Sequence, residues 1–278
     1  MKVYNTNSGL LIAHENEFYL LENENWDTFI NDDGILQNTL AKLNNGNRIK
    51  DPSSILKSEI KPPVESQEIW ASGVTYYNSK LGREEESKET GGSDFYARVY
   101  EAERPELFFK STGYRTVGHG GKVRIRKDST WNVPEPELTL VITSSGKIVG
   151  YTIGNDMSSR SIEGENPLYL PQAKTYDGCA AIGPCVLLTD SPLLRTTKIR
   201  LKIDREGRTV FSDEIGVDQI KRNLGDIVEY LYRECSFPYG SLLMTGTGIV
   251  PSNDFTLKRD DEIHITIDGI GTLYNTVA

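Results

Sequence analysis

Residues 135–161 read EPELTLVITSSGKIVGYTIGNDMSSRS, a pattern typical of a β-hairpin whose open end carries acidic side chains. In a strand, Glu135 and Glu137 lie on one face, because side chains two residues apart project the same way. The apolar run 138–142 continues this strand, and residues 147–153 form the returning one. The stretch therefore predicts a short β-hairpin.

A two-residue turn at Ser145–Gly146 sets the pairing of the two strands, since residue 144 then pairs with residue 147. This register places Asp156 opposite Glu135 and Gly154 opposite Glu137. Three carboxylates then share one face, where they repel one another or raise their own pKa values unless a cation neutralises them. Because all the ligands are oxygens, the pattern favours Mg²⁺, Mn²⁺ or Ca²⁺ over zinc.

An alternative interpretation is a solvated hairpin with acidic residues at its rim, since charged residues mostly lie on surfaces. Pro136 is tolerated at a strand edge or a bulge, which suits a rim as well as a site. A three-residue loop would also shift the register and move Asp156 to the other face. The hairpin alone leaves both interpretations open.

Length and composition predict a globular protein of one large domain, or of a large and a small one. The chain has 278 residues, 37% of them hydrophobic and 26% charged. No apolar stretch approaches the roughly 20 residues that a membrane span needs. The net charge of −9 argues against a nucleic-acid groove. The start lacks the pattern of a signal peptide, and the three cysteines form no C-x-x-C pair, so we expect a cytoplasmic protein.

Residues 1–66 look like a small α/β domain that covers or orients the rest, with KPPVES (61–66) as the linker. An amphipathic segment follows its strands and is interrupted at NDDG (31–34), which predicts two short helices. The strands of this domain are expected at 3–4, 10–14 and 18–21.

Residues 67–278 form the second predicted domain, in which strands dominate. Two helices are expected, one near 93–103 and one over 218–234 with Asp218 as its cap. The segment 78–94 is too charged for a core and is predicted to be a mobile loop or lid. The strands are expected at 69–74, 107–110, 122–126, 138–142, 147–153, 185–188, 199–203, 209–212, 242–245, 262–267 and 273–277.

With these segments in order, residues 67–277 resemble the fumarylacetoacetate hydrolase family. The resemblance implies an α+β, mainly β fold, a mixed β-roll or sandwich, in members that form dimers or tetramers. It also implies that Glu135, Glu137 and Asp156 bind Mg²⁺ or a similar ion and that Lys174 lines the pocket beside it. The motifs that carry it are SGVTYYNS (72–79), RPELFFKS (104–111), VGHG (117–120), EPELTLVI (135–142), GYTIGNDMSSRS (150–161), QAKTYDG (172–178) and MTGTGIVP (244–251).

Within the family, ENPLYLPQAKTYDGCAAIGP (165–184) looks closest to the 2-keto-3-deoxy-D-arabinonate dehydratases. In the family's hydrolases, the sequence after the first core strand resembles the pattern G-x-N-Y-x-x-H, in which the histidine helps to activate water. In this chain Thr75 stands for the asparagine and Ser79 for the histidine. The loss of that base weakens a hydrolase reading, whereas a dehydratase does not need it.

The expected enzyme is therefore a Mg²⁺-dependent hydro-lyase of pentose degradation that converts 2-keto-3-deoxy-D-arabinonate, or a similar sugar acid, to 2,5-dioxopentanoate. The reaction removes the C3 proton and expels the C4 hydroxyl through a metal-stabilised enolate. Glu106 is the first candidate for the acid and base, because its apolar neighbours would raise its pKa if it is buried. A surface ion pair with Arg104 or Lys110 is the alternative. Lys174, near three anions, is expected to give electrostatic support rather than act as the base.

Substrate contacts are predicted for Tyr76, Lys110, His119 and Thr247. Thr247 is expected to use its hydroxyl or backbone amide on the substrate carboxylate, a role that the family suggests. For His119, between two glycines, the favoured interpretation is a structural turn. For Tyr76 and Lys110, ordinary packing or surface charge is an equally open interpretation.

Two other functions stay open. The first is a hydrolase or decarboxylase of the same family that acts on an acylpyruvate-like substrate, using a base other than the one lost at Ser79. The second is a non-catalytic protein that binds metal and a sugar acid. In every case the expected partner is a small molecule, and the expected assembly is a homodimer or homotetramer.

Overall fold

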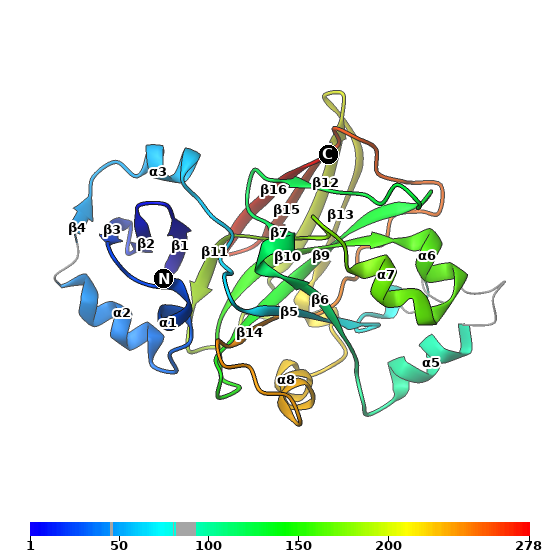
Figure 1. Cartoon of the computed structure of the whole chain (residues 1–278), viewed down its shortest axis with the longest axis horizontal. Helices are drawn as coiled ribbons and strands as arrows, with labels where there is room; N and C mark the ends of the chain where they lie inside the picture. Colours follow the sequence, from blue (N-terminus) through cyan, green and yellow to red (C-terminus); the bar gives the residue numbers. More distant parts are fainter. Residues whose placement is uncertain (45–46, 80, 82–92) are drawn as a thin grey trace.

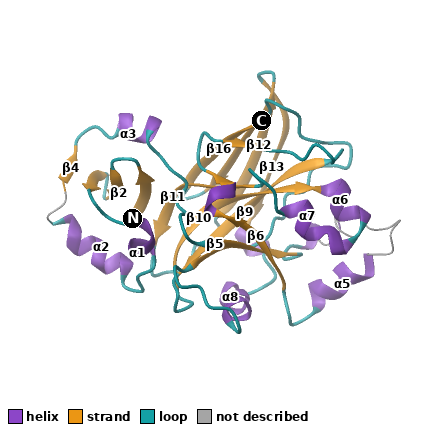
Figure 2. Cartoon of the chain, in the orientation of Figure 1, coloured by secondary structure: helices purple, strands orange, loops and turns teal. Residues whose placement is uncertain are grey.

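The computed structural model describes residues 1–44, 47–79, 81 and 93–278 (Figure 1). The segment predicted as a mobile loop, 78–94, falls mostly outside these residues. Among the described residues, no helix is long and apolar enough to cross a membrane. Strands dominate the chain, and the helices lie at its margins (Figure 2).

The larger sheet has eleven strands and carries the predicted hairpin at its centre. It is mixed: most neighbours are antiparallel, but β14 pairs with β5 in parallel and β7 pairs with β11 in parallel. In spatial order its strands are β4 (Asn47–Ile49), β3 (Glu17–Leu21), β2 (Gly9–His14), β1 (Lys2–Thr6), β11 (Ala180–Leu188), β10 (Ile148–Ser159), β9 (Asn132–Ile142), β14 (Ser241–Met244), β5 (Glu68–Gly73) and β6 (Glu106–Thr112), with β7 (Thr116–Val117) on β11.

The smaller sheet has five strands and packs one face on the larger sheet. Along β15 the isoleucines at 263, 265 and 267 are buried while the residues between them are not, which matches the predicted alternation. They share one core cluster with Leu138, Leu140 and Ile153 of the central hairpin. This arrangement confirms the predicted mixed β-roll or sandwich. The strands, in order, are β13 (Arg208–Gly216), β12 (Lys198–Arg205), β15 (Glu262–Ile267), β16 (Gly271–Val277) and β8 (Lys122–Val123).

The register predicted for the hairpin is confirmed at its acidic end, where Asp156 pairs with Glu135 and Gly154 with Glu137. The predicted two-residue turn is wrong. Thr143 N donates to Lys147 O at 2.9 Å, so the loop holds three residues. The pairing shifts by one between Ile148 and Gly150, where a β-bulge adds an extra residue to β10. The bulge offsets the longer loop, and the three carboxylates stay on one face.

The described part of the chain contains seven α-helices. The interruption at 31–34 does separate two helices, α1 and α2, as predicted. The helix expected over 218–234 is shorter: it begins at Leu224, and the Asn223 side chain, not Asp218, caps it by accepting from Gly225 N at 2.8 Å. The helices are α1 (Trp26–Ile30), α2 (Ile35–Leu43), α3 (Ser53–Ser58), α5 (Ser93–Glu101), α6 (Arg160–Glu165), α7 (Leu170–Lys174) and α8 (Leu224–Tyr232).

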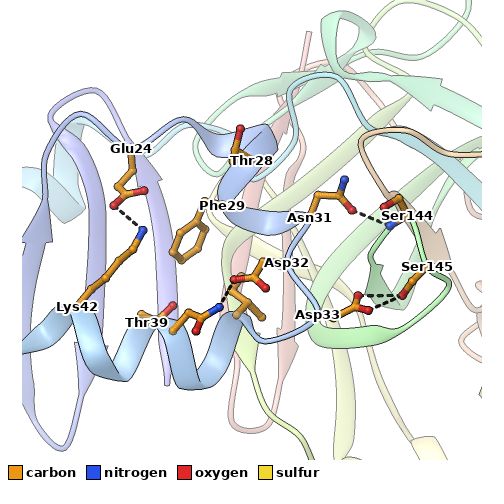
Figure 3. A pocket seen from close by; sticks show the side chains of 12 residues that line it. Glu24, Thr28, Phe29, Asn31, Asp32, Asp33, Thr39, Lys42, Ser144 and Ser145 are labelled. Atoms are coloured by element: carbon orange, nitrogen blue, oxygen red, sulfur yellow. Dashed lines mark hydrogen bonds and ion pairs between the residues drawn. The ribbon is translucent and has the colours of Figure 1, made fainter.

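The N-terminal elements form a lobe beside the roll (blue in Figure 1), yet their strands extend the larger sheet. The link is the antiparallel pairing of β1 with β11, at Val3 and Val186. The lobe also touches the hairpin loop across a polar groove of about 500 Å³ (Figure 3). There Ser144 N donates to Asn31, and the Ser145 hydroxyl donates to Asp33. Two sets of contacts therefore hold the lobe, one to β11 and one to the loop of the hairpin that carries the acidic residues.

Candidate metal and active site

Three carboxylates meet on one face of the larger sheet. They belong to Glu135 and Glu137 of β9 and to Asp156 of β10. One oxygen of each lies within 4.8 Å of the others, and all three side chains are buried. The rim interpretation is therefore wrong, because β9 and β10 run through the core for their full length. Pro136 is tolerated because the ladder between β9 and β14 ends at Thr139, so this part of β9 has a free edge.

Lys174, the last residue of α7, points its ammonium into this cluster. Its Nζ lies 2.7 Å from Glu135 Oε2 and 3.0 Å from Asp156 Oδ2, and donates to the Ser158 hydroxyl at 2.5 Å. The side chain is fully buried. A lysine surrounded by carboxylates in a region of low dielectric keeps its charge, because each neighbour favours the ammonium form.

Lys110 of β6 is a second buried cation, but it lies behind the cluster. Its Nζ is 2.7 Å from Asp156 Oδ1 and donates to Met157 O at 3.0 Å and to Lys174 O. One ion pair and two backbone hydrogen bonds therefore hold this ammonium in place. Lys110 does not line the cavity, so its predicted contact with substrate has no support in this geometry.

Arg160 and Glu163, both on α6, complete the charged cluster, and reasoning from the sequence missed them. Arg160 Nη2 lies 3.0 Å from Glu135 Oε1, and Glu163 Oε1 lies 3.3 Å from Lys174 Nζ. Both side chains are buried. A signal was present for Arg160, which stands an even number of residues after Asp156 along the same run.

Among the described residues, the cluster has four carboxylates against three cations, which is an excess of one negative charge. Burial raises the pKa of Glu137 well above its usual value, and the charges of Asp156 and Glu135 raise it further. Lys174 and the Gly246 N–H, which donates to Glu137 Oε2 at 2.5 Å, act in the opposite direction. An oxygen-rich, electronegative, buried cluster fits a hard divalent cation such as Mg²⁺.

A small cavity of about 20 Å³ opens onto these carboxylates, with room for little more than one ion or water molecule. Val74 in its wall has a φ of 53°, a backbone conformation that β-branched residues rarely adopt. Among the described residues, the cavity is lined by Ser72, Gly73, Val74, Ser79, Phe108, Glu135, Glu137, Asp156, Arg160, Lys174, Gly246 and Thr247.

Glu106 and Thr247, two of the predicted site residues, lie at this cavity. Thr247 lines it directly. Glu106 pairs with Gly73 across β5 and β6, and a Cβ placed on Gly73 would lie 2.0 Å from Glu106 Oε2. The half-buried carboxylate therefore lies against a glycine of the cavity wall, and a side chain at position 73 would displace it.

Tyr76 and His119, also predicted to contact substrate, lie away from the lining. Tyr76 is buried, which raises its pKa, and its ring packs under Gly248. His119 accepts from Tyr274 N at 3.2 Å through Nδ1, beside the smaller sheet, and burial lowers its pKa. Ser79 does line the cavity, but its hydroxyl donates to Tyr76 O at 2.8 Å and so stabilises a local turn.

Comparisons with known proteins agree with this geometry. The chain is 49% identical to a probable 2-keto-3-deoxyxylonate dehydratase of Haloferax volcanii, over 77% of this chain and 73% of that protein. It is 44% identical to the 2-dehydro-3-deoxy-D-arabinonate dehydratase of Saccharolobus solfataricus, over 82% and 79%.

A solved structure of a 2-keto-3-deoxy-D-arabinonate dehydratase, complexed with magnesium and 2,5-dioxopentanoate, superimposes with a TM-score of 0.85 at 38% identity. That match covers 100% of this chain and 98% of the solved one. Residues 75–278 match the family described as fumarylacetoacetate (FAA) hydrolase C-terminal. With most of its length matched in this way, the chain belongs to the fumarylacetoacetate hydrolase family.

Proposed function

We propose that this protein is a Mg²⁺-dependent dehydratase that converts 2-keto-3-deoxy-D-arabinonate, or a similar 2-keto-3-deoxy sugar acid, to 2,5-dioxopentanoate. The observation that carries the proposal is the buried set of three carboxylates with Lys174 beside it, in a chain whose relatives are named as dehydratases of such acids. Both names describe five-carbon acids in which C4 is the remaining stereocentre.

Glu135, Glu137 and Asp156 would hold the Mg²⁺ ion. When bound, the ion supplies Lewis-acid stabilisation of the negative charge that develops on the substrate next to its carboxylate. The charge balance supports this role, since one divalent cation turns the cluster's excess of one negative charge into an excess of one positive charge. An anionic sugar acid is then complementary to the site.

The chemistry needs one group that takes and returns protons. The C2 ketone acidifies the C3 proton; its removal and the departure of the C4 hydroxyl leave an unsaturated ketone. Transfer of a proton from C5 to C3 gives an enol, and transfer of its C5 hydroxyl proton to C4 then gives the aldehyde product, so that the net change is the loss of one water molecule. Glu106 is the proposed acid and base, because its carboxylate lies against Gly73 in the cavity wall.

The remaining roles follow from position. Lys174 holds its proton and stabilises negative charge on the substrate. Thr247 binds the substrate carboxylate with its hydroxyl or backbone amide. Lys110 fixes Asp156 from behind rather than touching substrate. For Tyr76 and His119 the geometry favours a structural role.

We further propose that residues 1–66 form the small domain that orients the hairpin, and that the chain works as a homodimer or homotetramer. Three free cysteines suit a cytoplasmic location. A C–C hydrolase of the same family is the second candidate. It is disfavoured because Ser79 occupies the position of the histidine in the hydrolase pattern, and its hydroxyl is engaged in a local turn.

A turnover assay tests the proposal, with 2-keto-3-deoxy-D-arabinonate as substrate and 2,5-dioxopentanoate as the product measured. We expect product with Mg²⁺, none with EDTA, and recovery when Mg²⁺ is returned. Glu106→Gln should abolish turnover while Mg²⁺ binding is retained, and Glu103→Gln, an exposed neighbour, is the matched control. Folded, metal-loaded protein that leaves this substrate unchanged but cleaves an acylpyruvate would contradict the dehydratase assignment.

A further inference from the structure

We propose a second metal site, for a borderline divalent cation such as Zn²⁺, on the outer face of the smaller sheet. Its ligands are Asp204 of β12 and Glu262 and His264 of β15, the other group of described residues whose ligand atoms all lie within 4.8 Å of one another. None of the three lines the cavity of the proposed active site. The inference is therefore independent of the dehydratase proposal.

The strand register places these residues together. Glu262 and His264 share one face of β15, because Ile263 and Ile265 turn into the core. Asp204 pairs directly with Glu262 across the ladder between β12 and β15 (Figure 1). The backbone of two paired strands therefore fixes the spacing, without help from a mobile loop.

The distances between the ligand atoms suit one metal ion. His264 Nε2 lies 3.5 Å from Asp204 Oδ2 and 3.7 Å from Glu262 Oε2. Two ligands that each lie about 2.0–2.2 Å from a tetrahedral zinc ion are about 3.3–3.6 Å from one another. These gaps are too long for good hydrogen bonds; the first falls within this range and the second exceeds it by 0.1 Å.

Neighbouring side chains orient two of the ligands. The Tyr274 ring, from the paired position on β16, lies 4.9 Å from the His264 ring, centroid to centroid. The Thr209 hydroxyl donates to Asp204 Oδ1 at 2.7 Å and leaves Oδ2 toward the imidazole. His264 Nε2 is shielded from solvent and has no hydrogen-bond partner in the described part of the chain. Supporting contacts of this kind are typical of metal sites.

The ligand types define the class of metal. An imidazole nitrogen suits Zn²⁺, Ni²⁺ or Cu²⁺, whereas Mg²⁺ prefers oxygen ligands alone, as in the buried cluster. Lys202 competes with a metal ion for Asp204, because its Nζ lies 2.6 Å from Asp204 Oδ2. Its side chain is 47% exposed, so it can turn into solvent when the ion binds.

The test is a titration of the metal-free, full-length chain with ZnCl₂, with Mg²⁺ present in excess to occupy the buried carboxylates. We expect the unaltered chain to bind one more equivalent of Zn²⁺ than His264→Gln. Asp204→Asn should weaken that binding at least tenfold. His14→Gln is the matched control, since among the described residues His14 belongs to no group of three metal-ligating side chains. Turnover with Mg²⁺ should be the same in His264→Gln as in the unaltered chain.

A second readout needs no variant. In the unaltered chain, added Zn²⁺ should move the imidazole ¹⁵N signal of His264, while those of His14 and His119 stay in place. Equal Zn²⁺ stoichiometry in the unaltered chain and in His264→Gln would overturn the proposal. So would a His264 signal that responds to pH but not to Zn²⁺, because the three groups would then form only an ion pair with a proton between them.

Discussion

Glu137 links the ionisation of the buried cluster to metal binding. Its raised pKa favours the protonated carboxyl in the folded, metal-free chain. The contribution of this protonated group to the stability of the fold is lost as the pH rises through its folded-state pKa. Mg²⁺ needs the carboxylate form, so binding releases a proton and its affinity rises with pH. Calorimetric titration in buffers of different protonation enthalpy should detect this proton, and Glu137→Gln should lose about 100-fold or more in affinity. A pH-independent affinity would contradict the assignment.

Glu163 offers a second test at the level of one side chain. Its carboxylate helps to hold the ammonium of Lys174 at 3.3 Å, so Glu163→Gln should lower kcat by about tenfold, or roughly 1.4 kcal/mol in the barrier. Glu165→Gln, on the exposed side of the same helix, should leave kcat unchanged. The measurement is steady-state kinetics at saturating Mg²⁺. Equal effects of the two substitutions would show that Glu163 has no such role.

Strand periodicity placed the three carboxylates together, and the family resemblance added Lys174 beside them. Reasoning from the sequence missed Glu163, since a glutamate on a short helix has no pattern that separates a buried position from a solvated one. It also placed Lys110 in contact with substrate. In the structure the Lys110 ammonium lies behind Asp156, away from the cavity. The sequence does not specify how deep in the core this side chain is buried.

At the level of elements, α8 provides a test of capping. The Asn223 side chain accepts from Gly225 N at 2.8 Å, whereas Asp218, expected to be the cap, precedes the helix. Asn223→Ala should lower the free energy of unfolding by about 1 kcal/mol. Asp218→Ala should change it by less than about 0.5 kcal/mol. Urea denaturation of the two variants measures the difference, and a larger loss for Asp218→Ala would contradict this account.

The hairpin shows how far an element can be predicted. The apolar runs indicated both strands, and the assumed two-residue turn gave the right partner for Glu135. The sequence did not reveal the extra residue in the loop or the bulge near Val149, because nothing in the local composition marks either. The predicted register at Glu135 is nevertheless correct, because the extra loop residue and the bulge offset one another. The same limit applies to the pairing of β1 with β11, which joins segments far apart in the chain.

For the molecule as a whole, the contact between the N-terminal lobe and the hairpin loop depends on ionised Asp33. Hydrogen bonds from Thr143, and secondly from Ser145, lower the pKa of Asp33. The contact therefore stabilises the fold at pH values above the ordinary pKa of an aspartate. This stabilisation is lost as the pH falls through the lowered pKa. Below about pH 4, the unaltered chain and Asp33→Asn should therefore converge in stability. Because Asp33 is exposed, the difference at neutral pH should stay below about 1 kcal/mol.

Thermal unfolding across pH measures this effect, with Asp32→Asn as a control from the same turn. A gap between the unaltered chain and Asp33→Asn that widens in acid would have the wrong sign.

The loop and bulge of the central hairpin also have a consequence for how the gene can change. Residues inserted or deleted between positions 143 and 150 can be absorbed by the loop or by the bulge, since both lie beyond the last pair that the carboxylates need. A single insertion between 135 and 142, or between 150 and 156, would instead turn one carboxylate to the opposite face. Length variation among descendants of this chain should therefore collect at the tip of the hairpin, with the two strands below it constant in length.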